Sequence, residues 1–304
     1  MRIVVYGAGS LGSLLGGLLQ ADGHDVTLVG RDPHVATVQS SGLRVETRES
    51  TETVHPNATT DGTGLDADLA LVTVKAFDTE TAAADLATGS FDAVCSLQNG
   101  LGNESTLAAH VDCPVYAGTA TYGAILHEPG RVECTGVGEV VVGFHEGGTG
   151  PADDLLERAL VGGGLVAAVV DDMPRRLWKK LAVNAGINTV TALTRSENGA
   201  LLDGTANGLA RDAARETARV ARGHDVRLSN REAVAAVEDV AEATAANTSS
   251  MLQDVESGRH TEVDAITGYV VDRAGEVRDA DVDVPVCATT ARLLRAWEEA
   301  RGLR

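Results

Sequence analysis

The feature that most constrains this chain is a glycine-rich turn between a strand pattern and a helical pattern. Residues 2–6 form a β-branched run, and the leucines that follow the turn recur at helical spacing. The residues of the turn are Gly7, Ala8, Gly9, Ser10, Leu11 and Gly12. In this position Gly7 allows a tight turn, Gly9 lets a pyrophosphate approach the backbone, and Gly12 lets helix and strand pack closely. The pattern predicts a dinucleotide site, and a glycine-rich turn without a ligand is the alternative.

The end of the second predicted strand, at residues 26–29, indicates which dinucleotide is preferred. Gly30 and Arg31 follow this strand. A guanidinium can pair with the 2'-phosphate of NADP, whereas NAD is recognised by an acidic residue that binds the ribose 2'-hydroxyl. Asp32 comes next, and it would serve NAD if Arg31 pointed away. We therefore expect NADP, used as NADPH, and leave NADH open.

Apolar strand patterns alternate with Ala- and Leu-rich helical patterns through the first part of the chain. Beyond the first two, the expected strands are 69–74, 93–96, 115–117 and 165–170. Two further runs, 131–134 and 139–144, are separated by Thr-Gly-Val-Gly and predict a hairpin near the edge of the sheet. A helix is expected over 151–160. The alternation of strand and helix predicts a parallel, doubly wound sheet.

The character of the chain changes near residue 172. Strand patterns then nearly vanish, and Ala, Arg, Glu and Leu recur at helical spacing to the last residue. A chain of 304 residues also exceeds what one hydrophobic core usually organises. We expect an α/β protein with an N-terminal doubly wound Rossmann-type domain at 1–172 and an all-helical C-terminal domain at 173–304.

The charge of the chain excludes two classes of partner. Asp and Glu number 44 against 25 Lys and Arg, which gives a formal net charge of -19. This charge repels nucleic-acid phosphates and anionic lipids, so neither a nucleic-acid nor a membrane partner is expected. An acidic, lysine-poor composition is typical of cytosolic proteins from extreme halophiles, where salt screens self-repulsion.

Other patterns bear on compartment and metal content. The first residues, Met-Arg-Ile-Val-Val-Tyr, lack the pattern of a signal peptide, and no apolar run approaches ~18 residues, so a cytoplasmic protein is expected. The cysteines are far apart, and no histidine lies at zinc-ligand spacing. We therefore expect neither a metal site nor a disulfide framework. The cysteines are Cys95, Cys113, Cys134 and Cys287.

Lysine occurs only at Lys75, Lys179 and Lys180. An ammonium can give up a proton, which arginine does not do at any working pH, although a lone lysine is ordinarily a solvated surface charge. Lys180, Asn184 and Asn188 have the spacing i, i+4, i+8, which places them along one side of a predicted helix. This stripe favours a ligand-binding face, with polar caps or interdomain hydrogen bonds as the alternative. Lys179 lies off the stripe and is expected to be a solvated surface charge.

A second polar cluster covers residues 247–254 and is followed by 259–264. Taken alone, this cluster is compatible with an ordinary helix start that Ser249 or Ser250 caps. With these segments assembled, the chain resembles the ketopantoate reductase family from the first strand nearly to the C-terminus. The resemblance rests on the turn at 7–12, LVTVKAF at 71–77, QNGLG at 98–102, LWKKLAVNAGIN at 177–188, and SSMLQD through RHTEVD at 249–264.

The resemblance implies NADPH-dependent reduction of 2-dehydropantoate (ketopantoate) to (R)-pantoate, in pantothenate and coenzyme A biosynthesis. It implies that Lys180 is the general acid and that Asn99 lies between nicotinamide and substrate. The implied substrate contacts are Asn99, Lys180, Asn184, Asn188, Asn198 and Ser250. The implied cofactor contacts, besides the glycine-rich turn, are Arg31, Lys75, Asn99, Ala124 and Glu262.

This chemistry agrees with the residue types. Hydride addition to a keto carbon generates an alkoxide, which a positioned ammonium stabilises and protonates. Glu262, if it lies near Lys180, would keep the ammonium charged. Two alternatives stay open, namely a related reductase of another 2-keto or 3-hydroxy acid, and a non-catalytic NADP-sensing protein. A sensor has no need for Lys180 and its asparagines. The oligomeric state is also open, with a homodimer as one option.

Overall fold

The structure, a computed structural model, describes residues 1–162, 164–277 and 282–304. The chain forms two compact units. The first consists of Met1–Gln98 and Asn103–Met173, and the second of Asn99–Gly102 and Pro174–Arg304. The short segment Asn99–Gly102 therefore belongs with the second unit, although the residue before it, Gln98, belongs to the first.

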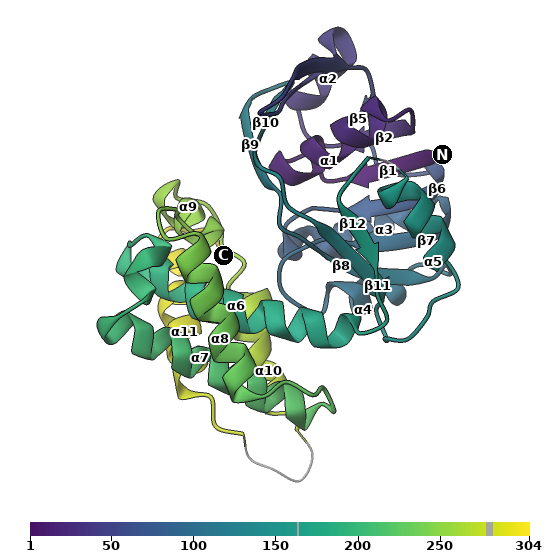
Figure 1. The fold of residues 1–304 in the computed structure, drawn as a ribbon. Helices are drawn as coiled ribbons and strands as arrows, with labels where there is room; N and C mark the ends of the chain where they lie inside the picture. The colour runs from purple at the N-terminus through teal and green to yellow at the C-terminus, as the bar shows by residue number, and fades with distance from the viewer. Residues whose placement is uncertain (163, 278–281) are drawn as a thin grey trace. The chain divides into compact units, whose positions relative to one another are not determined.

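In the described part of the first unit, eight strands form the main sheet, in the order β12-β11-β8-β7-β6-β1-β2-β5 (Figure 1). They are β1 (Arg2–Tyr6), β2 (Asp25–Val29), β5 (Asn57–Thr59), β6 (Asp66–Val72), β7 (Ser90–Ser96), β8 (Val115–Ala120), β11 (Val140–Phe144) and β12 (Ala167–Val169). The strands from β8 to β5 pair in parallel. In contrast, β11 is antiparallel to β8, and β12 runs parallel to β11.

Helices cover both faces of this sheet. Successive side chains of a strand point to opposite faces, and in β1 both sets are apolar and need to be covered. Ile3 and Val5 pack into one apolar cluster with the leucines of α1 (Ser10–Ala21). Val4 and Tyr6 pack into another cluster with α3 (Thr79–Leu86). The doubly wound sheet that the sequence predicts is confirmed.

The remaining helical segments of the first unit are short. They are α2 (His34–Ser41), the 3-10 turn η1 (Ala76–Asp78), α4 (Asn103–Ala108), α5 (Asp153–Leu156) and the π-helical turn η2 (Glu157–Val161). The helix expected over 151–160 is thus α5 followed by η2, and the strand expected over 165–170 is the shorter β12.

A second sheet of four strands, β4-β3-β10-β9, overturns one sequence prediction. Its strands are β3 (Leu43–Glu46), β4 (Thr51–Val54), β9 (Gly123–Glu128) and β10 (Arg131–Gly136). The hairpin predicted from 131–134 and 139–144 is wrong, because β10 pairs with β9 and β3, whereas β11 pairs with β8 and β12 in the main sheet. The Thr-Gly-Val-Gly segment carries the chain from one sheet to the other, and glycine-rich turns serve either purpose.

All the regular elements in the described part of the second unit are helical, as the sequence predicts. Its segments are α6 (Met173–Thr194), η3 (Asn198–Leu201), α7 (Gly204–Gly223), α8 (Asn230–Ala243), α9 (Ser250–Glu256), the π-helical turn η4 (Asp264–Gly268), α10 (Tyr269–Ala274) and α11 (Pro285–Glu299). Helix α6 packs closely on α7 and α8, since a Cβ on Gly186 would lie 2.9 Å from the carbonyl oxygen of Ala210 and 3.0 Å from Val237. Leu181 and Ala185 of α6 contribute to the same core.

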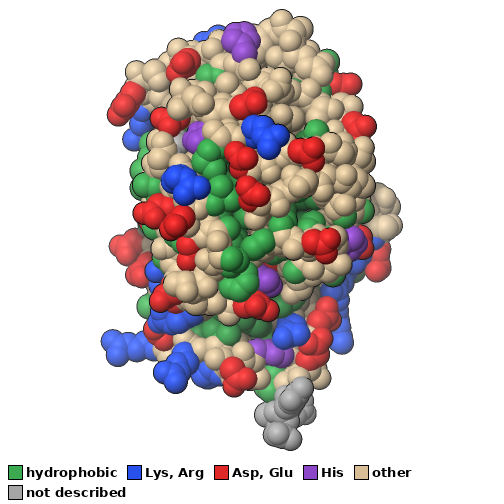
Figure 2. Space-filling model, turned by 90° about the vertical axis from the view of Figure 1, so that its right-hand side faces the viewer, with side chains coloured by type: hydrophobic (Ala, Val, Ile, Leu, Met, Phe, Trp, Pro, Cys, Tyr) green, Lys and Arg blue, Asp and Glu red, His purple; other side chains and the backbone are tan. Residues whose placement is uncertain are grey.

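The surface is acidic, as the composition requires. On the face drawn in Figure 2, Asp and Glu side chains are spread widely rather than gathered into one patch. Among the described residues, no helix is both long and apolar enough to cross a membrane.

Candidate active-site residues

The three glycines of the turn between β1 and α1 have different surroundings. Gly7 has a φ of +117°, and a Cβ there would lie 2.6 Å from the backbone nitrogen of Val74. A Cβ on Gly12 would lie 2.2 Å from the carbonyl oxygen of Gly7. No other described atom lies within 4 Å of a Cβ built on Gly9. The fold therefore requires glycine at positions 7 and 12, whereas the space beside Gly9 is open to a ligand.

The other residues of the turn are tied into the unit around it. Ala8 is buried, and Leu11 packs against the apolar cluster of α1. Ser10 begins α1, and its Oγ accepts a hydrogen bond from the backbone N–H of Leu126 in β9, at 3.1 Å. Ala124 lies two residues earlier in the same strand and is half-buried. The second sheet thus brings the Ala124 strand to the N-terminus of α1, where unpaired N–H groups favour an anion.

A buried histidine that sequence reasoning missed fixes the start of α1 to two neighbouring segments. His34 Nδ1 accepts a hydrogen bond from the N–H of Gly130 at 3.0 Å, and its Nε2 lies 3.0 Å from Ser13 Oγ. Burial lowers the pKa of His34. Because Nδ1 accepts, the imidazole is neutral and its Nε2 donates to Ser13. A lone histidine in a helical pattern carries no sequence signal for this role.

Arg31 and Asp32 follow β2 and have different partners. The Arg31 side chain is 85% exposed, and its Nη2 lies 2.9 Å from Asp78 Oδ2. Asp32 Oδ1 accepts a hydrogen bond from the N–H of Ala36 at 3.1 Å, so its carboxylate is engaged with the first turn of α2. An exposed ion pair contributes little to stability, and a phosphate can therefore replace Asp78 as the partner of Arg31.

Lys75 lies after β6 at the start of η1 and is half-buried. The buried Gln98, two residues after the end of β7, holds the adjacent backbone. Its Nε2 donates to the carbonyl of Val74 at 3.2 Å and to Thr79 Oγ1 at 2.7 Å. Sequence reasoning gave Gln98 no role of its own, although a polar residue just beyond the end of a buried strand was a usable signal.

In the second unit, α6 presents the predicted polar stripe. Lys180 and Asn184 are half-buried and Asn188 is 9% exposed, whereas Lys179 is exposed. Asn188 Nδ2 donates to Ser250 Oγ at 3.4 Å, which brings α9 to the stripe. Spacing alone predicts that Lys180, Asn184 and Asn188 share one side of the helix. Burial then distinguishes Lys180, which is half-buried, from Lys179, which is exposed.

The two serines at the start of α9 have different roles. Ser249 is buried, and its Oγ accepts from the N–H of Leu252 at 3.1 Å and lies 2.7 Å from Thr191 Oγ1. Ser249 is therefore the helix cap, which decides between the two candidates that the sequence left open. The side chain of Ser250 is exposed and contacts Asn188 instead.

Asn198 holds an unusual buried acceptor. Its backbone N–H donates to the carbonyl of Asn247 at 3.0 Å, and its Nδ2 donates to Thr244 Oγ1 at 2.9 Å. Within the described part of the chain, Asn198 Oδ1 is buried without a hydrogen-bond partner. Buried polar atoms are nearly always paired, so this oxygen is available to a bound donor.

Asn99 and Glu262 come together although they are far apart in sequence. Asn99 Nδ2 donates to Glu262 Oε2 at 3.3 Å, and Glu262 is 5% exposed. The N–H of Leu101 donates to the carbonyl of Ala265 at 3.2 Å. Among the described residues, no group of three or more His, Cys, Asp and Glu is arranged to hold a metal ion.

Two family models together match most of the chain. The model for "Ketopantoate reductase PanE/ApbA" matches residues 3–147, and the model for "Ketopantoate reductase PanE/ApbA C terminal" matches residues 172–298. The chain is 42% identical to the 2-dehydropantoate 2-reductase of Halobacterium salinarum over 301 residues, which are 97% of this chain and 98% of that protein.

Solved structures agree with these matches. A PanE/ApbA family ketopantoate reductase from Ralstonia eutropha JMP134 has a TM-score of 0.90 at 30% identity, covering 99% of this chain and 100% of that one. D-mandelate dehydrogenase in complex with NADH has a TM-score of 0.87 at 26% identity, covering 99% of each chain. The family resemblance that the sequence indicates is confirmed.

Proposed function

Because the chain belongs to the ketopantoate reductase family, we propose that it reduces 2-dehydropantoate to (R)-pantoate with NADPH, in pantothenate and coenzyme A biosynthesis. The observation that carries the proposal is the stripe of Lys180, Asn184 and Asn188 on α6, with Ser250 hydrogen bonded to Asn188. A proton donor beside neutral amides and a hydroxyl suits a keto acid whose oxygen becomes negative during reduction.

The dinucleotide is assigned to the first unit, whose residues fit it. The open space beside Gly9 and the N-terminus of α1 suit a pyrophosphate. Arg31 would bind the 2'-phosphate, while Asp32 is engaged with the N–H of Ala36, which supports NADPH over NADH. The bound cofactor would supply the hydride. The other proposed cofactor contacts are Lys75, Asn99, Ala124 and Glu262.

Lys180 is assigned as the general acid. Lys180 is half-buried, and its ammonium would stabilise negative charge on the substrate oxygen and then transfer a proton to it. Lysine suits this task because its pKa responds to burial, whereas a guanidinium stays protonated. Lys179, one residue away on the exposed side of α6, has no part in this assignment.

The substrate contacts are assigned to Asn184, Asn188, Asn198 and Ser250, with Asn99 next to the reacting carbon. Asn198 offers a specific test of substrate class, because its buried Oδ1 needs a donor. The hydroxyl of 2-dehydropantoate is such a donor, and pyruvate has none. A site with an unpaired acceptor discriminates against ligands that leave it unpaired.

A related activity, reduction of another 2-keto acid, is the second candidate. The likeness to D-mandelate dehydrogenase with NADH favours it, since that enzyme has the same fold over its whole length. Few side chains separate such substrates, so a bulky 2-keto acid belongs among the substrates to be tested.

The proposed setting is a cytoplasm of high salt concentration. The net charge of -19 and the similarity to a protein of Halobacterium salinarum support this. A dense carboxylate surface keeps a protein soluble when salt screens its self-repulsion.

The deciding experiment measures NADPH and NADH oxidation in concentrated KCl. The substrates are 2-dehydropantoate, pyruvate, 2-ketoisovalerate and phenylglyoxylate, and the readout is kcat/KM for each pair. We expect 2-dehydropantoate with NADPH to give the highest value. A higher value with phenylglyoxylate would assign the second candidate activity, and turnover with none of the four would contradict both.

A further inference from the structure

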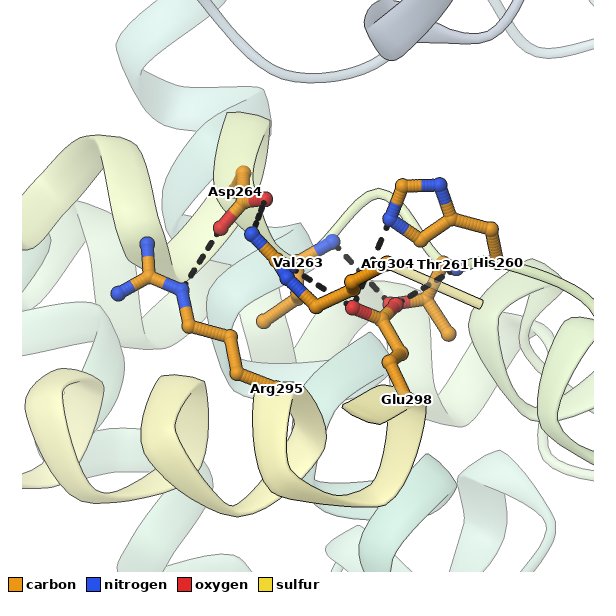
Figure 3. Close-up of polar contacts among 7 residues, drawn as sticks. All are labelled: His260, Thr261, Val263, Asp264, Arg295, Glu298 and Arg304. Atoms are coloured by element: carbon orange, nitrogen blue, oxygen red, sulfur yellow. Dashed lines mark hydrogen bonds and ion pairs between the residues drawn. The ribbon is translucent and has the colours of Figure 1, made fainter. Parts of the chain in front are cut away.

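A fully buried carboxylate in the last helix is bonded to the segment that carries Glu262. Glu298 of α11 is 0% exposed. Its Oε1 accepts two hydrogen bonds from Thr261, from the backbone N–H at 2.8 Å and from Oγ1 at 2.6 Å (Figure 3). Its Oε2 lies 2.8 Å from Arg304 Nη1 and 3.5 Å from His260 Nε2. The two hydrogen bonds from Thr261 and the guanidinium of Arg304 compensate a buried charge that would otherwise be costly.

A second carboxylate holds the same segment three residues further along. Asp264 lies 2.7 Å from Arg295 Nε and 2.7 Å from Arg304 Nη2, so that Arg304 links both carboxylates (Figure 3). Burial alone would raise the pKa of Asp264, but hydrogen bonds from the two arginines leave it below its ordinary value. The residues on either side of Glu262 are therefore fixed by charged groups.

The opposite side of this segment contacts the loop after β7. Glu262 accepts the hydrogen bond from Asn99, and the N–H of Leu101 donates to the carbonyl of Ala265. Gly100 passes so closely that a Cβ there would lie 2.4 Å from the Cβ of Ala265. The segment thus lies between α11 and the loop, with Thr261 bonded to one and Glu262 to the other.

We propose that Glu298 is a positioning residue, which acts through Thr261 to orient the carboxylate of Glu262 and, with it, the side-chain amide of Asn99. Two hydrogen bonds from one residue to one oxygen fix both the backbone and the rotamer of Thr261. The direction of the next side chain is then determined. The inference rests on the proposed function, in which Asn99 lies next to the reacting carbon.

Thr261→Val tests this, because valine keeps the shape of threonine and removes the hydroxyl donor to Glu298. We expect kcat/KM for 2-dehydropantoate to fall on the order of 10- to 100-fold, since small misplacements near a reacting centre have effects of this size. Thr261→Ser keeps the hydroxyl and should retain most of the wild-type kcat/KM. Amide hydrogen exchange at Leu101 should rise in Thr261→Val, a readout that does not depend on turnover.

The matched control is Thr290→Val in α11. Thr290 is also buried, and its hydroxyl donates to the carbonyls of Val286 and Cys287 in its own helix. Both Thr→Val variants should lose thermal stability, and Thr261→Val should lose more because its hydroxyl donates to a buried carboxylate. Thr290→Val should nevertheless keep wild-type kcat/KM and wild-type exchange at Leu101. If the two substitutions changed kcat/KM and exchange at Leu101 equally, Glu298 and Thr261 would have only a structural role, and the inference would be overturned.

A double-mutant cycle identifies the route of the effect. If Glu298 acts through Glu262, Thr261→Val should have little further effect on kcat/KM in a Glu262→Gln background. Additive losses would contradict the inference. An enzyme that reduces none of the 2-keto acids would disprove the proposed function, and the exchange at Leu101 would still decide whether the segment is positioned from α11.

Discussion

Lys179 and Lys180 are neighbours on α6, yet only Lys180 shares the half-buried side with Asn184. We predict that Lys180→Ala lowers kcat by about 10²- to 10⁴-fold, the usual loss for a positioned general acid. Lys180→Arg should not restore activity, because a guanidinium donates its proton too reluctantly. Steady-state kinetics measure both effects, and NADPH binding by fluorescence verifies that the variants are folded.

The control for this prediction is Lys179→Ala, which removes an equal charge one residue away. Its kcat should stay close to the wild-type value, because the side chain points about 100° from the stripe. A large loss in Lys179→Ala with normal turnover in Lys180→Ala would mean that the assigned side of α6 is the wrong one.

Arg31 tests the choice of cofactor. In Arg31→Ala the proposed contact with the 2'-phosphate is lost, which should weaken NADPH binding by about 1.5 to 3 kcal/mol, or roughly 10- to 150-fold. NADH binding should barely change, because NADH has no phosphate at that position. Asp78→Ala frees Arg31 from its present partner and should not weaken NADPH binding. Equal losses with both dinucleotides in Arg31→Ala would remove the assignment.

His34 makes stability depend on pH. Burial lowers the pKa of its side chain from the ordinary 6.5. Between 6.5 and the lower pKa of the folded state, the unfolded chain binds a proton that the folded chain does not, so stability falls as the pH drops through this window. His34→Gln should reduce the loss of unfolding free energy between about pH 7 and about pH 5, measured by chemical denaturation. If the unfolding free energy of His34→Gln depended on pH as steeply as that of the wild type, other groups would be responsible for the pH dependence.

At the scale of elements, two glycines of the turn between β1 and α1 are needed for different reasons, Gly12 for the fold and Gly9 for the proposed binding of the dinucleotide. Gly12→Ala places a Cβ against the carbonyl of Gly7 and should destabilise the protein by about 1 to 3 kcal/mol. Gly9→Ala meets no described atom within 4 Å, so thermal stability should stay near wild type.

NADPH titration completes this prediction. Gly9→Ala should weaken NADPH binding by more than about tenfold, because its methyl group occupies the space that a pyrophosphate needs. Thermal unfolding and fluorescence titration of both variants measure the two properties separately. Wild-type NADPH affinity in Gly9→Ala would show that the dinucleotide does not approach this turn.

At the scale of the whole molecule, the net charge of -19 makes the stability of the protein depend on salt. Carboxylates spread over the surface repel one another, and salt screens them within a few ångströms at high concentration. We predict that the midpoint of thermal unfolding rises from about 0.1 M to about 1 M KCl and rises more slowly beyond, because screening is then nearly complete. Ammonium sulfate at equal ionic strength is the comparison. If sulfate alone stabilised the protein, burial of apolar surface rather than charge screening would be responsible.

Features with short-range causes could be predicted from the sequence. The strand, glycine-rich turn and helix at residues 2–21 follow from local periodicity and from the freedom of glycine backbone. The polar stripe of α6 follows from the i, i+4 geometry of any helix. The predicted hairpin failed, since the glycines between β10 and β11 are compatible with either a hairpin or a crossover between sheets.

The sequence by itself determined the α/β class, the glycine-rich turn after β1 and the polar side of α6, because each depends on residues within a few turns of one another. Only the tertiary structure decided that β10 joins a second sheet, that His34 fixes the start of α1, and that Asn99 meets Glu262. Likewise, Glu298 has no local pattern that marks it. Such contacts join residues many positions apart, and they form only where the packing of the complete core brings the backbones together.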